Sequence, residues 1–188
     1  GLGDWYDIGP KAPGSSQLTP QGITATATYW EDLRVLEATA RLLGRNPEAE
    51  AWSAKRAATL QAFQKAFYHD AEKTYATGSQ TSLALPLALG MAPEAARPAL
   101  ADRLVADIRA RGNHTSAGDI GYHYVLAALT QAGRDDVVFD MANNPVGPSY
   151  AGQLAAGATA LTEAWDASPD SSNNHLMLGH IQEWFYAG

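Results

Sequence analysis

Apolar residues recur along the chain at helical spacing, and no stretch shows the strict alternation that is typical of a half-buried β-strand. Capping residues, prolines and glycines locate the helix ends. Thr19-Pro20 and Asn46-Pro47 mark two starts, and Gly44 and Gly133 mark two stops. The pattern predicts helices at about 23–43, 46–68, 80–89, 93–111, 117–132, 134–142 and 174–186, with a short one near Gln153. The helix at 80–89 is apolar on nearly every side and is therefore expected to be buried.

Three connections between these helices are long and rich in aromatic, amide and carboxylate groups: residues 1–18, 69–79 and 143–173. Loops beyond about 12 residues in a compact domain are more often functional than decorative. We therefore predict an all-α fold of consecutive helical hairpins with elaborate loops on one side. Such hairpins suit a toroidal α/α barrel, of which the predicted helices would supply only a part.

Composition excludes several classes of protein. The 188 residues are 46% apolar and 18% charged, which is enough for a core and unlike a disordered chain. A net charge of −7 with scattered acidic residues argues against a nucleic-acid partner, which requires a clustered basic face. No run approaches the roughly 18 apolar residues of a membrane span. The absence of cysteine excludes disulfides and thiolate metal sites.

The stretch 161–167, LTEAWDA, contains two carboxylates around an indole. Glu163 and Asp166 would share one face of a helical turn, with Thr162 as its cap and the acids favoured by the helix dipole. Spacing alone favours this ordinary helix start. Trp165 favours the alternative, because an indole face stacks on a pyranose ring while carboxylates bind hydroxyl groups or activate water. Asp166 is expected to be a supporting or capping carboxylate.

The stretch 171–186, SSNNHLMLGHIQEWFY, predicts a final helix capped by one of its first polar residues. His175 would fall in the first turn, at the mouth of the long connection, where a side chain can face a cleft. His180 lies further in and is expected to pack in the core. These histidines and Glu183 suggest a metal, but a spacing of five places the histidines on different helix faces, unlike the pair in zinc proteases. No metal site is predicted.

Two other segments combine acids with aromatic or hydroxyl groups. GLGDWYDIG sets Asp4 and Trp5 in a glycine-flanked loop, which is either a turn anchored by one Trp or a wall of a sugar site; its place in a loop favours the latter modestly. In RGNHTSAGDIGYHY, Asp119 precedes a helix and is most simply a capping or dipole partner. No Gly-x-Ser-x-Gly elbow supports a Ser-His-Asp triad.

Four segments in this order carry a resemblance over nearly the whole chain: GDW, HTSAGDIGYHYVLAALTQAGRDD, PSYAGQLAAGATALTEAWDA and SSNNHLMLGHIQEWFY. Together they resemble the catalytic domain of bacterial α-L-rhamnosidases, family 78 of the glycoside hydrolases. The last two segments are the most specific. The resemblance implies an (α/α)6 barrel that releases terminal α-L-rhamnose with inversion.

Inversion requires two carboxyl groups about 6.5–9.5 Å apart, one protonating the leaving oxygen and one activating water. The resemblance assigns Glu163 as the general base, and it implies sugar contacts for Asp4, Trp5, Trp165 and His175. The chain departs from the family pattern at Thr162, where family members carry Trp. Its connection from Glu163 to His175 is also short for the family, so the rim of the sugar subsite is expected to differ.

In the family, the general acid lies upstream of the GDW segment. Residues 1–188 are therefore expected to be the C-terminal part of the barrel, with the remaining part of the same catalytic domain as partner. The chain alone would be inactive or nearly so. The expected substrate is a rhamnose-containing glycoside or polysaccharide, without a cofactor, and the expected location is periplasmic or secreted. Two alternatives stay open: a non-catalytic helical module that binds carbohydrate or protein, and another (α/α)6-barrel glycosidase or lyase.

Overall fold

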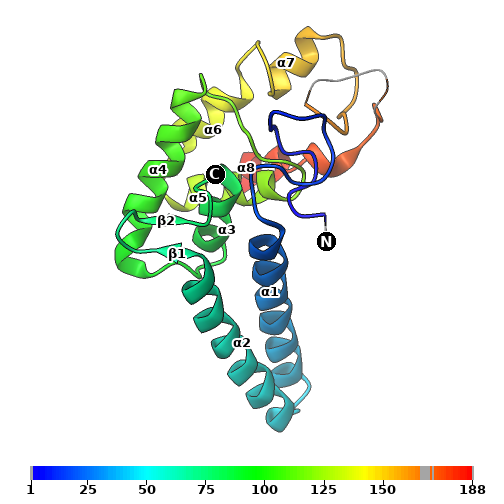
Figure 1. Ribbon diagram of the computed structural model, residues 1–188. Helices are drawn as coiled ribbons and strands as arrows, with labels where there is room; N and C mark the ends of the chain where they lie inside the picture. The colour runs from blue at the N-terminus through cyan, green and yellow to red at the C-terminus, as the bar shows by residue number, and fades with distance from the viewer. Residues whose placement is uncertain (1, 166–169, 171, 188) are drawn as a thin grey trace.

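Helices dominate residues 2–165, 170 and 172–187, which are the residues that the computed structural model describes (Figure 1). The α-helices are α1 (Gln21–Leu42), α2 (Asn46–Phe67), α3 (Gln80–Ala88), α4 (Arg97–Ala110), α5 (Gly121–Gln131), α6 (Asp135–Ala142), α7 (Tyr150–Ala155) and α8 (Ile181–Ala187). Single 3-10 turns are η1 (Glu94–Ala96) and η2 (Leu176–Leu178), and a small hairpin is formed by β1 (Tyr68–His69) and β2 (Thr74–Tyr75). The predicted all-α class is confirmed.

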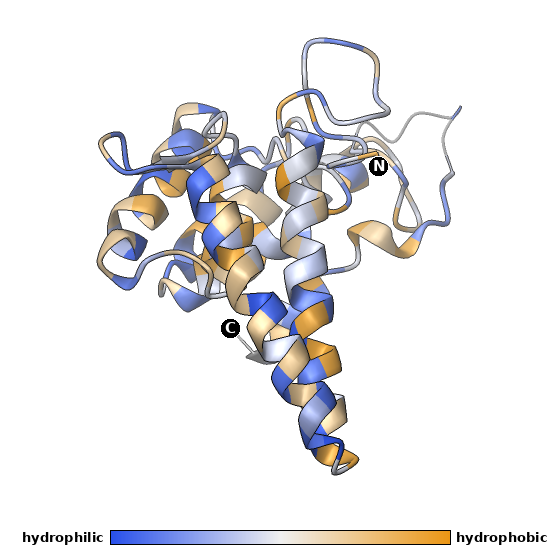
Figure 2. Cartoon of the chain, turned by 60° about the horizontal axis from the view of Figure 1, so that its bottom comes forward, coloured by the Kyte–Doolittle hydropathy of each residue, from blue (hydrophilic) through white to orange (hydrophobic). Residues whose placement is uncertain are grey.

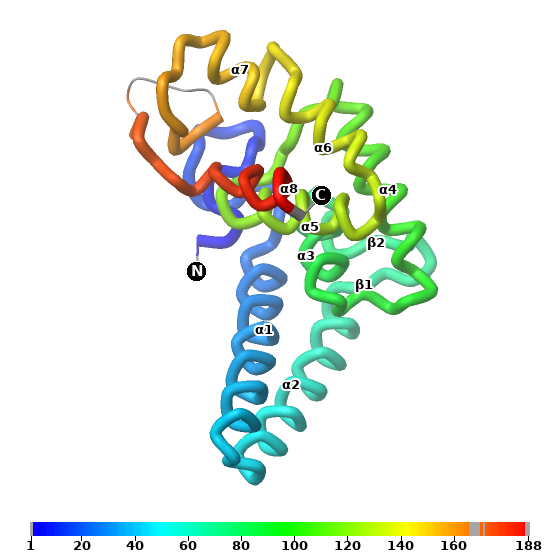
Figure 3. The backbone as a smooth tube through the Cα atoms, turned by 180° about the vertical axis from the view of Figure 1, so that it is seen from behind, coloured from blue at the N-terminus to red at the C-terminus, as the bar shows by residue number. Residues whose placement is uncertain are grey.

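The first two helices begin and end close to the predicted signals. Pro47 lies in the first turn of α2, where its missing N–H costs no hydrogen bond. Gly44 adopts a φ of +70° directly after α1, which a glycine accepts without the steric penalty of a side chain. The two helices pack along their length as a hairpin that projects away from the other elements (Figure 1), also when seen from behind (Figure 3).

Helix α3 forms the centre of the core, as its uniform apolarity predicts. Eight of its residues, from Gln80 to Leu87, are buried. It packs against α1, α4 and α5, and α5 packs in turn against α6 and α8. Successive hairpins therefore place α1, α3, α5 and α8 next to one another, with α2, α4 and α6 as their outer partners.

The N-terminal ends of these inner helices lie at the same end of the molecule. The Thr19 hydroxyl, just before α1, is 2.7 Å from the Ser79 hydroxyl, which caps α3. The side chain of Gln80 reaches the segment before α5: its amide donates to the His114 carbonyl at 3.1 Å, and its oxygen accepts the Ser116 N–H at 2.8 Å. Loops at this end are therefore tied to each other and to the helix starts.

Three local predictions are wrong. The connection 69–79 contains part of a β-hairpin, in which Tyr68 pairs with Tyr75; strands of two residues are too short to leave an alternating pattern. The fifth helix begins at Gly121 and not at 117. The last helix begins at Ile181 and not at 174, because the preceding residues use their backbone groups in tertiary hydrogen bonds.

Candidate active site

The N-terminal loop, residues 2–18, is fastened to the inner helices by the buried carboxylate of Asp4. This carboxylate accepts three hydrogen bonds: from the Thr81 hydroxyl, from the Gly118 N–H at 3.0 Å and from the Gly121 N–H at 2.7 Å. Burial raises the pKa of Asp4 above its usual range, against the opposing effect of these donors. The residue that was predicted to contact sugar is fully buried and caps α5 from another part of the chain.

The same loop is held in shape by a second buried acid. The carboxylate of Asp7 accepts the backbone N–H groups of Gln17 and Leu18, at 2.9 and 2.7 Å, and the Ser16 hydroxyl at 3.2 Å. Asp4 and Asp7 are thus both saturated with donors, as buried carboxylates need to be.

Trp5 joins this loop to the segment before α5 through its backbone. Its carbonyl accepts the Asp119 N–H at 2.7 Å. At Gly118 an added Cβ would lie 2.0 Å from that carbonyl oxygen, so only glycine permits the close approach. The indole of Trp5 is half-buried, with its ring centroid 5.3 Å from that of Tyr6. The structure thus places this predicted sugar contact next to the start of α5.

Two paired stretches, residues 161–163 and 172–175, bring Glu163 and His175 together. The Glu163 N–H donates to the Ser172 carbonyl at 2.8 Å, and the His175 N–H donates to the Leu161 carbonyl at 2.9 Å. The carboxylate of Glu163 accepts the Ser172 N–H at 3.2 Å. The predicted helical turn is wrong at Glu163, which lies in a bend, and the hydroxyl of Thr162 donates to the Ala164 carbonyl. Asp166 lies outside the described residues.

Trp165 follows Glu163 and turns its ring into the molecule. It is 6% exposed and packs edge-on against Tyr122 and Tyr150, with ring centroids 4.9 and 5.3 Å away. Its indole N–H has no hydrogen-bond partner among the described residues. Trp165 lines a cavity of about 370 Å³ together with Tyr6, Ile8, Pro148 and others. The predicted sugar-stacking residue therefore borders a cavity, with tyrosines against its ring.

Asp119 is the site residue that the sequence interpretation missed. It does not cap α5, because the Gly121 N–H at the helix start donates to Asp4. It is 4% exposed, and burial raises its pKa to about 6; His175 opposes the increase, and the negative charges of Asp4 and Glu163 add to it. Asp119, Glu163, His175 and Asp4 therefore form one electrostatic cluster at the N-terminal end of α5. The only available signal was an acid between glycines immediately before a helix.

A second group of ionisable side chains lies on the neighbouring face of α5. The rings of His123 and His180 are 4.9 Å apart, and His123 is 3.6 Å from the Glu183 carboxylate. Burial lowers the pKa of His180, which agrees with its prediction as a packing histidine. Within the described part of the chain, no three His, Cys, Asp or Glu residues are arranged to hold a metal ion. No helix in that part is long and apolar enough to cross a membrane.

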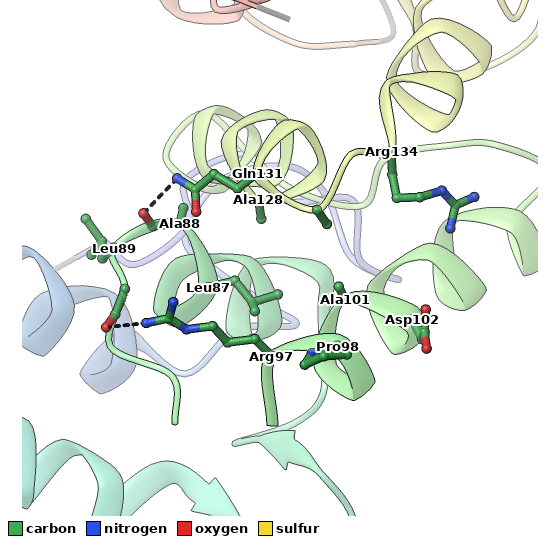
Figure 4. Close-up of a pocket in the computed structure, with 12 residues that line it drawn as sticks. Leu87, Ala88, Leu89, Arg97, Pro98, Ala101, Asp102, Ala128, Gln131 and Arg134 are labelled. Carbon is green, nitrogen blue, oxygen red and sulfur yellow. Dashed lines mark hydrogen bonds between the residues drawn. The ribbon is translucent and has the colours of Figure 1, made fainter. Parts of the chain in front are cut away.

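A larger cavity, of about 530 Å³, lies at the opposite ends of the inner helices (Figure 4). Leu87 and Leu89 from the end of α3, Arg97 from α4 and Gln131 from the end of α5 line it. Arg97 and Gln131 donate to the carbonyls of Gly90 and Ala88, at 3.3 and 3.1 Å. These polar groups are satisfied within the fold, and the carboxylate cluster is at the other end of α5.

Consecutive helical hairpins, with carboxylates gathered at one end of the inner helices, place this chain in the class of helical-hairpin domains. The chain belongs to the family of the bacterial α-L-rhamnosidase six-hairpin glycosidase domain, whose model matches residues 1–188. This confirms the resemblance and identifies the hairpins as part of an (α/α)6 barrel.

Individual relatives agree with the family. An α-L-rhamnosidase of Streptomyces avermitilis is 31% identical over 198 residues, which cover 100% of this chain and 18% of that protein. The structure of Streptomyces avermitilis α-L-rhamnosidase complexed with L-rhamnose matches with a TM-score of 0.88 and 30% identity, covering 100% of this chain and 18% of that one. The native Aspergillus terreus α-L-rhamnosidase matches with a TM-score of 0.89 and 27% identity, covering 98% and 23%. The chain thus spans about a fifth of the length of these relatives.

Proposed function

We propose that this chain forms the general-base side of the active site of an inverting α-L-rhamnosidase, with Glu163 as the base. The observation that carries the proposal is the convergence of Glu163, His175 and Asp119 at the N-terminal end of α5 in a chain of this family. The Ser172 N–H on the Glu163 carboxylate, at 3.2 Å, orients it while leaving lone pairs for a water molecule.

The reaction then proceeds in one displacement. The carboxylate of Glu163 accepts a proton from water as the water oxygen attacks the anomeric carbon of a terminal α-L-rhamnose. The glycosidic C–O bond breaks, and the leaving oxygen takes a proton from a carboxylic acid on the other face of the sugar. The products are β-L-rhamnose and the free aglycone. The acid is supplied by the rest of the catalytic domain, outside residues 1–188.

Four residues are proposed to build the sugar side of the site. Trp5 contributes aromatic surface from the N-terminal loop, and Trp165 contributes it from the segment after Glu163. His175 contributes an imidazole, and the Leu161 carbonyl fixes the backbone of this residue. Asp4 acts indirectly: it holds the loop of Trp5 on α5, since all of its carboxylate surface is buried against protein donors.

Substitution of Glu163 by Gln in the complete protein tests the proposal. The amide cannot accept the proton of water, so kcat on p-nitrophenyl α-L-rhamnoside should fall by about 10²- to 10⁴-fold. The matched control is Glu183→Gln on α8, whose side chain is 68% exposed and which should retain wild-type kcat. NMR of the first product should show the β-anomer, as inversion requires.

Near wild-type hydrolysis by Glu163→Gln would refute the role of this residue. A panel of other p-nitrophenyl glycosides separates the alternatives: activity on another sugar with none on rhamnose would indicate a different barrel glycosidase. Sugar binding by the complete protein without hydrolysis of any glycoside would indicate a binding module.

A further inference from the structure

The three buried aspartates near the site differ in one respect. Asp4, Asp7 and Asp119 are 0%, 2% and 4% exposed. Asp4 and Asp7 are each saturated by protein N–H and O–H donors. Within residues 2–165, 170 and 172–187, no hydrogen bond reaches the carboxylate of Asp119. Its backbone N–H donates to the Trp5 carbonyl at 2.7 Å, and its carbonyl faces the ring of His180.

An almost buried carboxylate without donors is costly to maintain unless something else supplies the hydrogen bonds. The groups that act on Asp119 come from each neighbouring element: Asp4 from the N-terminal loop, Glu163 and His175 from the paired stretches, and the ring of His180 at the Asp119 carbonyl. Asp4 and Glu163 are negative, so these neighbours do not neutralise the charge of Asp119. The donors that complete Asp119 therefore come from outside these described residues, and a bound ligand can supply them.

We propose that Asp119 is a substrate-contacting residue whose carboxylate accepts hydrogen bonds from hydroxyl groups of the bound sugar, beside Glu163 and His175. A pair of adjacent sugar hydroxyls has the required chemistry, because it supplies two O–H donors without a charge. The inference rests on the proposed function, because it places the reacting rhamnose next to Glu163. It extends that function by naming the part of the ligand that Asp119 holds.

The raised pKa of Asp119, about 6, provides a specific signature. Sugar hydroxyls favour the ionised form, so binding lowers the pKa of Asp119 and releases part of a proton near pH 6. A residue that serves only the fold would not couple its proton to sugar binding.

The experiment measures L-rhamnose binding by calorimetry to the complete protein carrying Glu163→Gln, with and without Asp119→Asn. Adding Asp119→Asn should weaken binding by about 10- to 100-fold at pH 7.5, as expected for losing hydrogen bonds to a charged group. Titration at pH 6 in buffers of different ionisation enthalpy should show proton release with Glu163→Gln alone and none with both substitutions. Asp32→Asn, an exposed carboxylate on α1, is the matched control and should leave binding unchanged.

The outcomes separate this inference from the proposed function. If the wild-type protein neither binds L-rhamnose nor hydrolyses α-L-rhamnosides, the proposed function fails. If the wild type is active and Asp119→Asn leaves binding and proton release unchanged, the role of Asp119 is overturned and the proposed function stands. A loss of thermal stability in Asp119→Asn as large as that in Asp4→Asn would also overturn it, because Asp119 would then be a structural residue.

Discussion

At the scale of single residues, Asp4 and Asp119 show how equal burial can serve opposite purposes. One carboxylate is surrounded by three protein donors, and the other has none among the described residues. Asp4 fastens the N-terminal loop to the start of α5, and its carboxylate is therefore not available to a ligand. The second lies next to Glu163 and His175 and retains its capacity to accept.

The substitution Asp4→Asn tests the structural role of the Asp4 carboxylate. The amide must direct its NH2 group at an N–H or O–H donor, leaving buried groups unpaired. We expect the free energy of unfolding to fall by about 1–3 kcal/mol for each group left unpaired, measured by urea denaturation of the complete protein. The exposed control Asp32→Asn should change it by less than about 0.5 kcal/mol. Equal effects of the two substitutions would contradict the anchoring role.

Asp119 makes stability depend on pH in a defined direction. Its pKa is raised from 3.8 to about 6 in the folded protein, so the folded state binds more protons than the unfolded state between these values. The stability that protonated Asp119 contributes to the folded state is fully present below pH 3.8 and is lost as the pH rises through 6. The full shift corresponds to about 3 kcal/mol, and solvent screening reduces this to about 1–2 kcal/mol.

Asp119→Asn removes this dependence. The substituted protein should be as stable as the wild type or more so at pH 7.5, and the difference between them should diminish toward pH 4. Thermal melts from pH 4 to 8 would measure it. A variant that is less stable than the wild type at pH 7.5 would show that the charge of Asp119 is compensated in the fold.

At the scale of elements, the start of α5 is where the N-terminal loop and the inner helices are joined. A Cβ on Gly118 would be 2.0 Å from the Trp5 oxygen in this loop. A Cβ on Gly121 would be 1.9 Å from the Thr81 hydroxyl on α3 and 2.7 Å from the Asp4 carboxylate. A methyl group on Gly118 therefore forces the loop away from α5, whereas one on Gly121 first displaces the Thr81 hydroxyl that donates to Asp4.

Gly118→Ala should therefore destabilise the protein more than a glycine replacement that meets only backbone strain. Gly133→Ala is the control, because Gly133 has a φ of +66° and open space around it, with an expected cost of about 1 kcal/mol. We expect Gly118→Ala to cost about 3 kcal/mol or more, and to reduce kcat/KM by displacing Trp5. Similar melting temperatures for the two variants would contradict the close packing of loop on helix.

Sequence periodicity predicts the long elements well because each buries one face or, in α3, every face. It fails at residues 174–180, where polar side chains typical of a helix cap precede a 3-10 turn in place of the predicted α-helix. There, tertiary hydrogen bonds from Glu163 and His175 outweigh local propensity. The pairing of these residues was expected only from the family resemblance. Asp119 was misinterpreted because its burial arises from a loop more than 100 residues earlier in the chain, which no local pattern reveals.

At the scale of the whole molecule, the α1–α2 hairpin carries apolar residues that the described part of the chain leaves exposed. Tyr29 and Leu36 on α1 and Leu43 directly after it are spaced by seven residues, so they follow one side of the helix, and they are 40%, 43% and 62% exposed. Figure 2 shows apolar positions along this hairpin as far as its tip. The matched relatives are about five times longer than this chain, so we expect the rest of the same catalytic domain to pack on this stripe.

Leu36→Ala tests that expectation in the complete protein. If the stripe is buried there, removing the side chain leaves a cavity and lowers the free energy of unfolding by about 2–4 kcal/mol. Leu42→Ala is the control, because Leu42 lies off the stripe at the end of α1 and is 87% exposed. In residues 1–188 produced alone, the two substitutions should have equally small effects. A difference that is present in the complete protein and absent in the shorter chain would locate the packing partner outside these residues, whereas equal effects in both would show that the stripe faces solvent.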